Sequence, residues 1–376
     1  MRVPSGVVGA ALCVATCGLL PSAAAHATQP ARDEPIGGAL LTGRDAVSQP
    51  LEGAPALPTG LTASAWVIAD ADTGEVLAAK APHAHYLPAS TLKTLTAVTL
   101  LPLLDPQRQV KVTWHDAAVD GSKVGLVPGM SYSVSKLFAA MLVVSGNDAA
   151  DALAQAAGGM RRTVQLMNAT AHHLQAYDTV ARTPSGLDAP GEHTSAYDLA
   201  LIARAGLDMS DFRHYISIVR SRMPAPHQKH FEIYTHNHLL TTYRGAIGVK
   251  NGYTDAARGT YIGAATRGGH TLIVTLLHAQ PYFWDEAKSL LNWGFAAEGH
   301  VIPVGLLVGP EQPTEQPPPV ADDPSTRQTV VLASRHHSTF AWWQLSALAG
   351  SAAVAVLVTA RRQRRRHRHR LSLPPL

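Results

Sequence analysis

The chain has 376 residues, of which 46% are hydrophobic and 15% are charged, and its formal net charge is +4. This length allows a large buried core, and the composition is that of a globular protein with additional apolar segments. Arg2 and seven arginines among residues 361–370 supply eight of the 31 basic residues, so the rest of the chain holds 23 basic against 27 acidic residues. This mildly acidic balance predicts no nucleic-acid partner.

The N-terminus has the pattern of a secretory signal peptide. An apolar run over residues 7–20 is followed by small residues that end in Ala25-His26-Ala27, an A-x-A cleavage pattern. We therefore predict that residues 1–27 are removed on export. Cys13 and Cys17 both lie in this segment and fit a lipobox poorly, so the mature chain is expected to hold no thiol and no disulfide.

A β-hairpin is predicted after a flexible N-terminal linker. Residues 28–60 are rich in Pro, Ala and Gly without a helical or strand period, which is typical of a linker. Compact apolar runs at 65–70 and 75–78 flank an Asp-Thr-Gly turn and predict two paired strands. A helix rich in Leu, Thr and Ala is predicted over residues 91–101.

The middle of the chain is predicted to be mainly helical. Residues 133–157 have an apolar helical face that Ser145-Gly146-Asn147 interrupts, which favours a junction between two helices. Residues 160–206 are also expected to be mainly helical, with a turn-rich loop at 183–188. Another loop is predicted around residues 224–238.

Strands return near the end of the folded part. They are predicted over residues 246–250, 260–265 and 270–277, and a last helix over 285–295. Strands at both ends with helices between them predict one α/β (α+β) domain over residues 61–300, with a sheet that joins the two ends.

The C-terminus has the pattern of a membrane anchor. Residues 309–339 read as a Pro-rich spacer, and residues 341–360 carry no charge over a length that could cross a bilayer. The basic residues of 361–376 follow directly. By the positive-inside rule this tail is cytoplasmic, so we expect a single-pass cell-membrane protein with its folded body outside. A buried core helix is the alternative for 341–360.

Three short motifs carry hydroxyl, amine and amide groups. Ser90 and Lys93 are three residues apart, which places both on one helical face, and a neutral lysine could take the proton of the serine. Ser145-Gly146-Asn147 lies at the predicted helix junction, and Lys250-Asn251-Gly252 at a predicted strand end. Each motif alone is common, and a solvated loop or a strand-edge lysine is its ordinary explanation.

Together and in this order, the motifs resemble the S-x-x-K, S-x-N and K-T-G signatures of serine penicillin-recognising enzymes. Flanking sequence narrows the resemblance to the D-alanyl-D-alanine carboxypeptidases of the low-molecular-mass penicillin-binding proteins, peptidase family S11. The blocks that carry it, within residues 63–298, are 65–93, 142–150, 183–200, 248–254 and 291–295. The resemblance implies a serine β-lactamase/penicillin-binding-protein-like transpeptidase fold, with an antiparallel sheet flanked by helices and a helical subdomain.

The resemblance also implies roles for the residues. Ser90 would be the nucleophile that attacks the bond between the two terminal D-alanines of a peptidoglycan stem pentapeptide, and β-lactam antibiotics would acylate it. Lys93 would be the general base, Ser145 a proton relay, and Asn147 a positioning amide. No metal or other cofactor is expected.

The third motif would bind the substrate. Lys250 would attract the terminal carboxylate and, together with partial burial, would lower the pKa of Lys93. Asn251 and Gly252 would line the same strand. The backbone N–H groups of Ser90 and Tyr253 would form the oxyanion hole.

This chain departs from the family pattern in three ways. Asn251 stands where most of the superfamily has threonine, so an amide replaces a hydroxyl that would bind the carboxylate. The stretch 278–285 lacks the arginine that some members use for the same carboxylate. The second, all-β domain of many members is also not apparent. We expect retained activity with an altered rate or β-lactam affinity.

Four alternatives to a serine carboxypeptidase could each explain part of this sequence. A β-lactamase would need a base for deacylation, but no Glu-x-x-Leu-Asn string follows the second motif, and Glu192 is set in a different sequence. A D,D-endopeptidase would use the same chemistry on cross-links, and a catalytically weak peptidoglycan-binding protein could share the fold. The 19 histidines include His83/His85, His172/His173 and His236/His238, but none has the Glu or Cys companions of a hydrolytic zinc site.

Overall fold

The structure, a computed structural model, describes residues 36–312. The predicted signal peptide, most of the spacer, the apolar segment at 341–360 and the basic tail lie outside the described residues. Within residues 36–312, no helix combines the length and apolarity that a membrane crossing requires.

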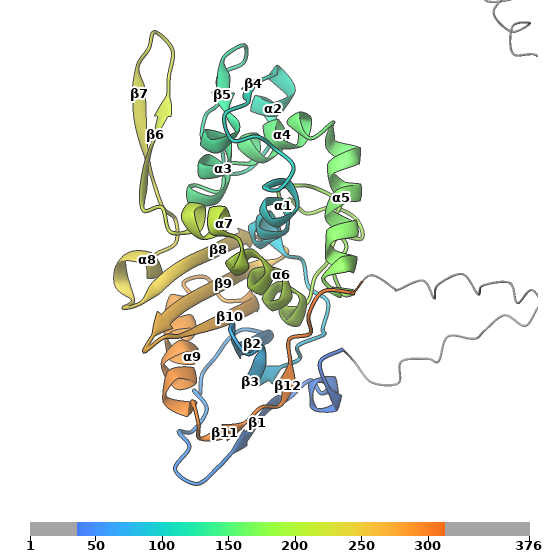
Figure 1. Ribbon diagram of the computed structural model, residues 1–376, viewed down its shortest axis with the longest axis vertical. Helices are drawn as coiled ribbons and strands as arrows, with labels where there is room; N and C mark the ends of the chain where they lie inside the picture. Colours follow the sequence, from blue (N-terminus) through green and yellow to red (C-terminus); the bar gives the residue numbers. More distant parts are fainter. Residues whose placement is uncertain (1–35, 313–376) are drawn as a thin grey trace, which may run out of the picture. The chain divides into compact units, whose positions relative to one another are not determined.

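An eight-stranded antiparallel sheet forms the centre of the fold (Figure 1). Its strands are β1 (Ala46–Pro50), β2 (Ala65–Asp70), β3 (Glu75–Lys80), β8 (Ala246–Thr254), β9 (Arg258–Arg267), β10 (His270–Ala279), β11 (Val301–Ile302) and β12 (Gly305–Leu306). The order is β11-β1-β3-β2-β10-β9-β8, and β12 pairs with β3. The pairing of β2 with β10 joins segments about two hundred residues apart in the sequence, as the strand pattern at both ends predicted.

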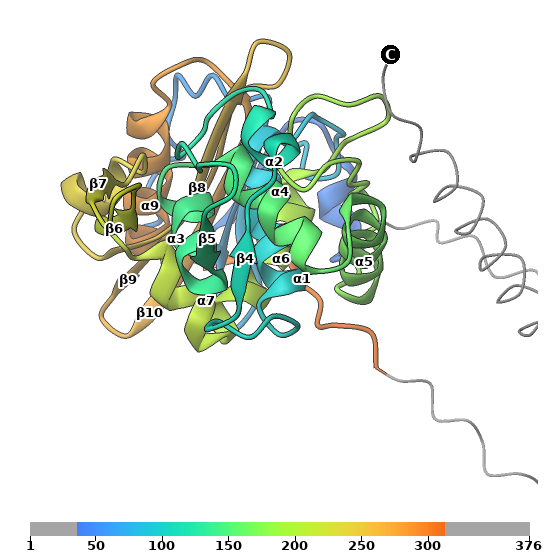
Figure 2. The same cartoon turned by 90° about the horizontal axis from the view of Figure 1, so that it is seen from above.

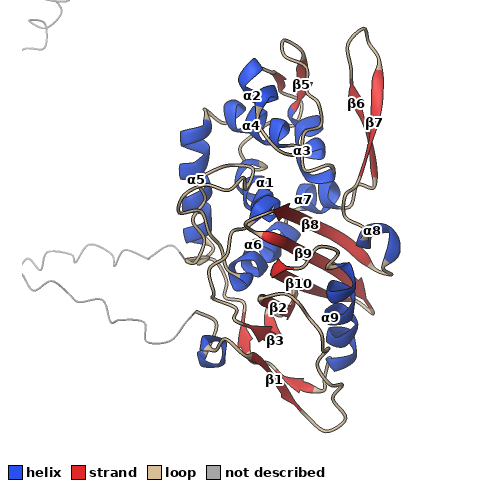
Figure 3. Cartoon of the chain, turned by 180° about the vertical axis from the view of Figure 1, so that it is seen from behind, coloured by secondary structure: helices blue, strands red, loops and turns tan. Residues whose placement is uncertain are grey.

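Helices cover both faces of this sheet (Figure 3). The helices of the described part are α1 (Lys93–Leu100), α2 (Trp114–Ala118), α3 (Val134–Val143), α4 (Asn147–Ala156), α5 (Met160–His173), α6 (Ala196–Asp208), α7 (Ser210–Ile216), α8 (Leu239–Thr242) and α9 (Trp284–Ala297). Helix α9 lies on one face, and α6 packs on the other against β2 and β10. Seen from above, α2 to α5 gather with the small two-stranded sheet of β4 (Gln109–Lys111) and β5 (Ser131–Ser133) (Figure 2). The fold is therefore α+β with a helical subdomain, as predicted.

Strand β2 shows why the central strands read as compact apolar runs. Trp66 and Ile68 pack in one core cluster with Leu290 of α9, whereas Val67 packs on the opposite face in a cluster that includes α6. Every residue of β2 is buried. A strand covered on both faces needs apolar residues at successive positions, so the alternation of a half-exposed strand is missing.

The prediction of a flexible linker over 28–60 is wrong for its described part. Residues 46–50 form β1, which pairs with β3 from Ala46↔Lys80 onward and with β11 through Pro50↔Val301. Side chains of this strand are half-buried or exposed, so its place depends on backbone pairing and leaves little apolar pattern in the sequence. Because β11 and β12 also join the sheet, the folded body extends beyond the predicted limits of 61 and 300 at both ends.

The loop predicted around 224–238 is largely a hairpin. β6 (Arg220–Pro224) pairs with β7 (His230–Tyr234), and the hairpin projects alongside the helical subdomain (Figure 1). Met223 and Ile233 are buried on its inner side, while residues 226–229 between the strands are exposed. Two prolines and only two buried apolar positions explain why the sequence pattern was that of a loop.

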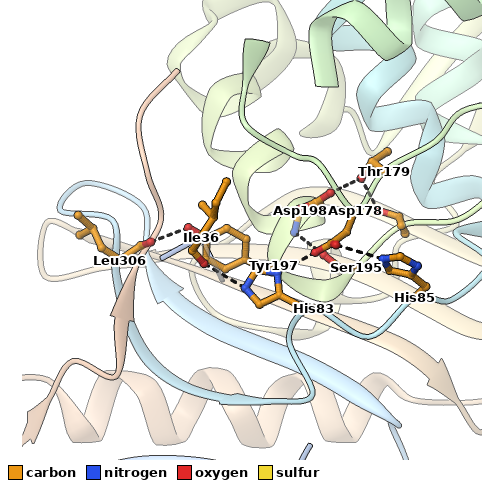
Figure 4. Close-up of polar contacts among 10 residues, drawn as sticks. Ile36, His83, His85, Asp178, Thr179, Ser195, Tyr197, Asp198 and Leu306 are labelled. Atoms are coloured by element: carbon orange, nitrogen blue, oxygen red, sulfur yellow. Dashed lines mark hydrogen bonds and ion pairs between the residues drawn. The ribbon is translucent and has the colours of Figure 1, made fainter. Parts of the chain in front are cut away.

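Asp178 anchors the segment that leads to the first motif (Figure 4). Its two carboxylate oxygens lie 2.7 Å from His83 Nδ1 and 3.1 Å from His85 Nε2. The other ring nitrogen of His83 lies 3.0 Å from the carbonyl oxygen of Ile36. These two histidines therefore hold chain segments together.

The first and last described segments run side by side. Leu306 donates its backbone N–H to the carbonyl of Gly37 at 2.8 Å. Its own carbonyl accepts a hydrogen bond from the buried hydroxyl of Tyr197 on α6 at 2.6 Å (Figure 4). Helix α6 therefore helps to fix both segments beside the sheet.

Candidate active site

Ser90 lies in a 3₁₀ turn, η2 (Ala89–Leu92), that runs directly into α1. The turn is pinned through the carbonyl of Pro88, which accepts hydrogen bonds from Thr91 Oγ1 at 2.6 Å and from Thr260 Oγ1 of β9 at 2.9 Å. Ala89 has a φ of 45°, a left-handed conformation that costs energy for a residue with a side chain. The sheet thus holds the serine in a strained turn at a helix start.

Two glycines let other segments approach this turn closely. A Cβ atom on Gly252 of β8 would lie 2.6 Å from the backbone nitrogen of Ser90. A Cβ atom on Gly186, which has a φ of 77°, would overlap the carbonyl oxygen of Ala89. Strand β8 and the loop at 183–188 therefore contact the serine turn at positions where only glycine fits.

Lys93 is fully buried, and its Nζ has three oxygen neighbours. The distances are 3.0 Å to Ser90 Oγ, 2.6 Å to Asn147 Oδ1 and 2.6 Å to the carbonyl oxygen of Ser185. These partners come from η2, α4 and the loop before α6. The structure thus brings together the serine and lysine of the first motif and the amide of the second.

The two lysines of the site both have lowered pKa values. Burial, and after it the positive charge of Lys250, lowers the pKa of Lys93 well below its usual value. Burial lowers the pKa of Lys250 to about 7. The sequence anticipated both causes for Lys93, and burial is the larger. A lysine that loses its charge this easily can accept a proton from a hydroxyl group.

The second motif lies at the junction between α3 and α4, as predicted. Ser145 is buried with a φ of 62°, and its hydroxyl has no hydrogen-bond partner within residues 36–312. Asn147 begins α4; its Nδ2 donates to the carbonyl of Asp120 at 2.7 Å and its backbone N–H donates to that of Ser122 at 2.7 Å. The asparagine is therefore fixed by both its side chain and its backbone.

The third motif lies along β8 beside the serine turn. Lys250 is buried and its Nζ donates to the carbonyl of Asn251 at 2.6 Å. Asn251 is half-buried and pairs in register with Tyr261 of β9. The side chain of Tyr253 is 49% exposed, so this end of β8 is open to solvent.

Three contributors to the site were not assigned from the sequence. They are the carbonyl of Ser185, which accepts from Lys93, and the buried carboxylates of Asp148 and Glu192. A carbonyl has no sequence signal. The two acids stand inside the blocks that resemble family S11, but neither is part of a motif and Glu192 lies in a polar stretch, so the sequence carries no signal for its role.

One group of described residues has metal-ligand geometry, and it lies elsewhere. Asp70, His270 and Glu298 approach one another, with His270 Nδ1 2.6 Å from Glu298 Oε1 and 3.9 Å from Asp70 Oδ2. They sit at the end of β10 where His270 pairs with Arg267, opposite the end where Ala279 pairs with Gly259 near the third motif.

The profile of one protein family, described as D-alanyl-D-alanine carboxypeptidase (Peptidase_S11), matches residues 52–281. The chain belongs to family S11. This S11 protein is 40% identical over 259 residues to the D-alanyl-D-alanine carboxypeptidase DacB2 of Mycobacterium tuberculosis, covering 67% of this chain and 88% of the relative. It is 30% identical over 245 residues to a D-alanyl-D-alanine carboxypeptidase of a Streptomyces species, covering 60% and 84%.

Solved structures agree with the family. A D-alanyl-D-alanine carboxypeptidase of M. tuberculosis matches with a TM-score of 0.64 at 39% identity, over 70% of this chain and all of that one (100%). The Streptomyces K15 DD-transpeptidase matches with a TM-score of 0.62 at 27% identity, over 64% and 100%. This S11 protein is thus a serine-type carboxypeptidase with the penicillin-binding-protein-like fold expected from its sequence.

Proposed function

We propose that this carboxypeptidase removes the terminal D-alanine of peptidoglycan stem pentapeptides through an acyl-enzyme on Ser90, and that β-lactams acylate the same atom. The observation that carries the proposal is the 3.0 Å contact between Ser90 Oγ and Nζ of Lys93, a buried amine of lowered pKa. Nucleophile and base are within hydrogen-bonding distance, which serine acylation requires.

Acylation begins with the transfer of the Ser90 proton to Lys93. Neutral Lys93 takes the Ser90 proton as Oγ bonds to the peptide carbonyl carbon, and the carbonyl oxygen becomes an oxyanion. The backbone N–H groups of Ser90 and Tyr253 stabilise that oxyanion. When the C–N bond breaks, the proton returns from Lys93 to the D-alanine nitrogen, with Ser145 as relay. Water later frees the shortened peptide from Ser90.

Substrate recognition depends on β8. Lys250 supplies positive charge toward the terminal carboxylate, and the Asn251 amide can donate a hydrogen bond in place of the usual hydroxyl. The glycine at 252 lets β8 lie directly against the serine turn, so substrate groups held by this strand come next to Ser90.

A fluorescent penicillin tests the acyl-enzyme. We expect the full-length protein to be labelled, and Ser90→Ala to lose labelling and D-alanine release by more than about 10³-fold. Lys288→Gln, a change on the surface of α9, is the matched control. Equal labelling of the wild type and of Ser90→Ala would disprove the proposed nucleophile, and an unlabelled wild type would favour a catalytically silent protein.

The same preparation separates carboxypeptidase from D,D-endopeptidase activity. Incubated with a soluble pentapeptide, the protein should release one alanine, measured by mass spectrometry. Incubated with a cross-linked muropeptide dimer, it should leave the cross-link intact. Cleavage of the dimer at a comparable rate would assign the endopeptidase function.

We propose that the protein is a single-pass cell-membrane protein with its catalytic domain outside the cytoplasm. The support comes from the sequence: an A-x-A pattern at 25–27, an uncharged segment at 341–360 and the arginine-rich tail. Protease added to intact spheroplasts should digest the catalytic domain and spare an epitope placed after residue 376. A catalytic domain protected until lysis would contradict this topology.

A further inference from the structure

Two of the three acceptors around Lys93, Asn147 Oδ1 and the carbonyl of Ser185, depend on neighbouring loops for their position. Its partner Asn147 takes its orientation from the loop at 120–126, through the carbonyls of Asp120 and Ser122. Its partner Ser185 lies in the loop at 182–186. The placement of the amine therefore depends on two loops that contain none of the three family motifs.

A buried carboxylate gathers the backbone N–H groups of the first loop. Asp148 Oδ2 accepts from Gly125 at 2.8 Å and Leu126 at 3.0 Å, and Oδ1 accepts from Val124 at 3.0 Å and Ala149 at 2.9 Å. Asp148 is completely buried and follows Asn147 directly in α4. Each oxygen therefore accepts two backbone N–H groups, which ties the loop to the start of α4.

A second buried carboxylate does the same for the other loop. Glu192 Oε2 accepts from the backbone N–H groups of Arg182 and Thr183, both at 2.9 Å, and from Thr183 Oγ1 at 3.1 Å. Thr183 Oγ1 in turn accepts from Gly186, the glycine packed on Ala89. The other oxygen, Oε1, is buried without a hydrogen-bond partner in the described chain.

We infer that Asp148 and Glu192 are positioning residues of the general base: Asp148 fixes the loop that orients Asn147, and Glu192 fixes the loop that presents the Ser185 carbonyl to Lys93. The inference rests on the proposed acylation of Ser90. Neither acid contacts the substrate in this proposal. The hydrogen bonds that each acid accepts are expected to matter more for the acylation rate than its negative charge.

If the acids acted only through their negative charge, removing them would have the opposite effect on the acylation rate. The negative charges of Asp151, Glu192 and Asp148 all raise the pKa of Lys93, against burial and Lys250, which lower it. Removing any one of these acids by charge alone would leave more Lys93 neutral at a given pH, and would not slow acylation below the pKa. A loss of acylation rate in that range therefore reports lost positioning.

Replacing each acid by its amide should also have different effects at the two positions. In Asp148→Asn an NH₂ group would face two backbone donors, so two hydrogen bonds are lost. In Glu192→Gln the carbonyl oxygen can keep all three bonds, with the NH₂ at the unpartnered Oε1 position. Asp151→Asn is the matched control, since Asp151 is buried near Lys93 but bonds to neither loop within the described residues.

The test measures acylation of the full-length protein by a fluorescent penicillin, together with backbone hydrogen exchange. We expect Asp148→Asn and Glu192→Ala to slow acylation by about 10²-fold and to speed exchange at 124–126 and 182–183 respectively. Glu192→Gln and Asp151→Asn should acylate at the wild-type rate or faster, because losing a nearby negative charge leaves more Lys93 neutral. Wild-type rates in Asp148→Asn and Glu192→Ala, or an equal loss in Asp151→Asn, would overturn the inference while leaving the proposed function intact.

A second measurement is independent of acylation. In protein carrying ¹³C-labelled lysine, the side-chain resonance of Lys93 should move in Asp148→Asn and stay near its wild-type position in Glu192→Gln. If the wild type is not acylated at all, the proposed function fails, and this resonance decides the positioning role. An unmoved resonance in Asp148→Asn would overturn it.

Discussion

Lys93 and Lys250 are two buried amines with no ion-pair partner in the described chain. Each is held by oxygen atoms of uncharged groups, and Lys93 also feels the charge of Lys250. Since protonating one amine disfavours protonating the other, the pair provides a neutral base and a cation in one site.

Removing the second amine should shift the pH dependence of acylation. Protonated Lys93 cannot accept the Ser90 proton, so the rate rises as pH passes through the pKa of Lys93. Lys250→Gln removes a charge that lowers this pKa, so the acid limb of the profile should move to higher pH. The measurement is the rate of penicillin acylation from about pH 5 to 9, with Lys288→Gln as control. An acid limb that stays or moves to lower pH would contradict the coupling.

Asn251 is the residue at which the sequence departs from the superfamily, and the structure gives its side chain no hydrogen bond within residues 36–312. We expect Asn251→Thr to raise kcat/KM for a pentapeptide by up to about tenfold, because a hydroxyl can donate to the carboxylate from a shorter side chain. Steady-state kinetics of D-alanine release check this, with a peptide amidated at its C-terminus as control substrate. An equal gain on the amidated peptide would show that the carboxylate is not involved.

The sequence predicted only those site residues that belong to the three motifs. Ser90, Lys93 and Asn147 meet at hydrogen-bonding distance, whereas Ser145 lies at the predicted junction without a bond to Lys93. The carbonyl of Ser185 could not be predicted, since any residue supplies one and only the path of the loop brings it to the amine.

Among the elements, β8 and the serine turn are the pair on which the chemistry depends. We expect Gly252→Ala to slow acylation by at least about 10²-fold, because its Cβ would lie 2.6 Å from the Ser90 nitrogen, a proposed oxyanion-hole donor. Gly43→Ala, where φ is −73° and a Cβ meets nothing within 4 Å, is the control for a general effect of the substitution. A normal acylation rate in Gly252→Ala would show that β8 can move away.

Elements were predictable where the pattern was strong. The β2–β3 and β9–β10 hairpins, the α3–α4 junction and α9 lie where apolar runs and turn residues placed them. β1, β6 and β7 were missed because their side chains are half-exposed, and backbone pairing leaves no trace in composition.

For the whole molecule, the strands at the two ends complete the sheet. A fragment of residues 61–300, the predicted domain, lacks β1, β11 and β12 and so exposes the edge of β3. Compared with residues 36–312, we expect its Tm to be lower by at least about 10 °C, as for a loss of several kcal/mol in a domain of this size. Thermal unfolding followed by circular dichroism checks this; equal Tm values would mean that the end strands add nothing.

The backbone hydrogen bond between Leu306 and Gly37 keeps the first and last segments of the folded body close together, which is useful for engineering. A body whose chain enters and leaves at neighbouring points can be spliced into a surface loop of an unrelated host protein without pulling that loop apart. The closeness of the two end segments also allows a circular permutant. A short peptide would join the present ends of the folded body, and the new termini would lie in the exposed β6–β7 turn, between His227 and Gln228. The catalytic body could thus be displayed on a carrier of choice.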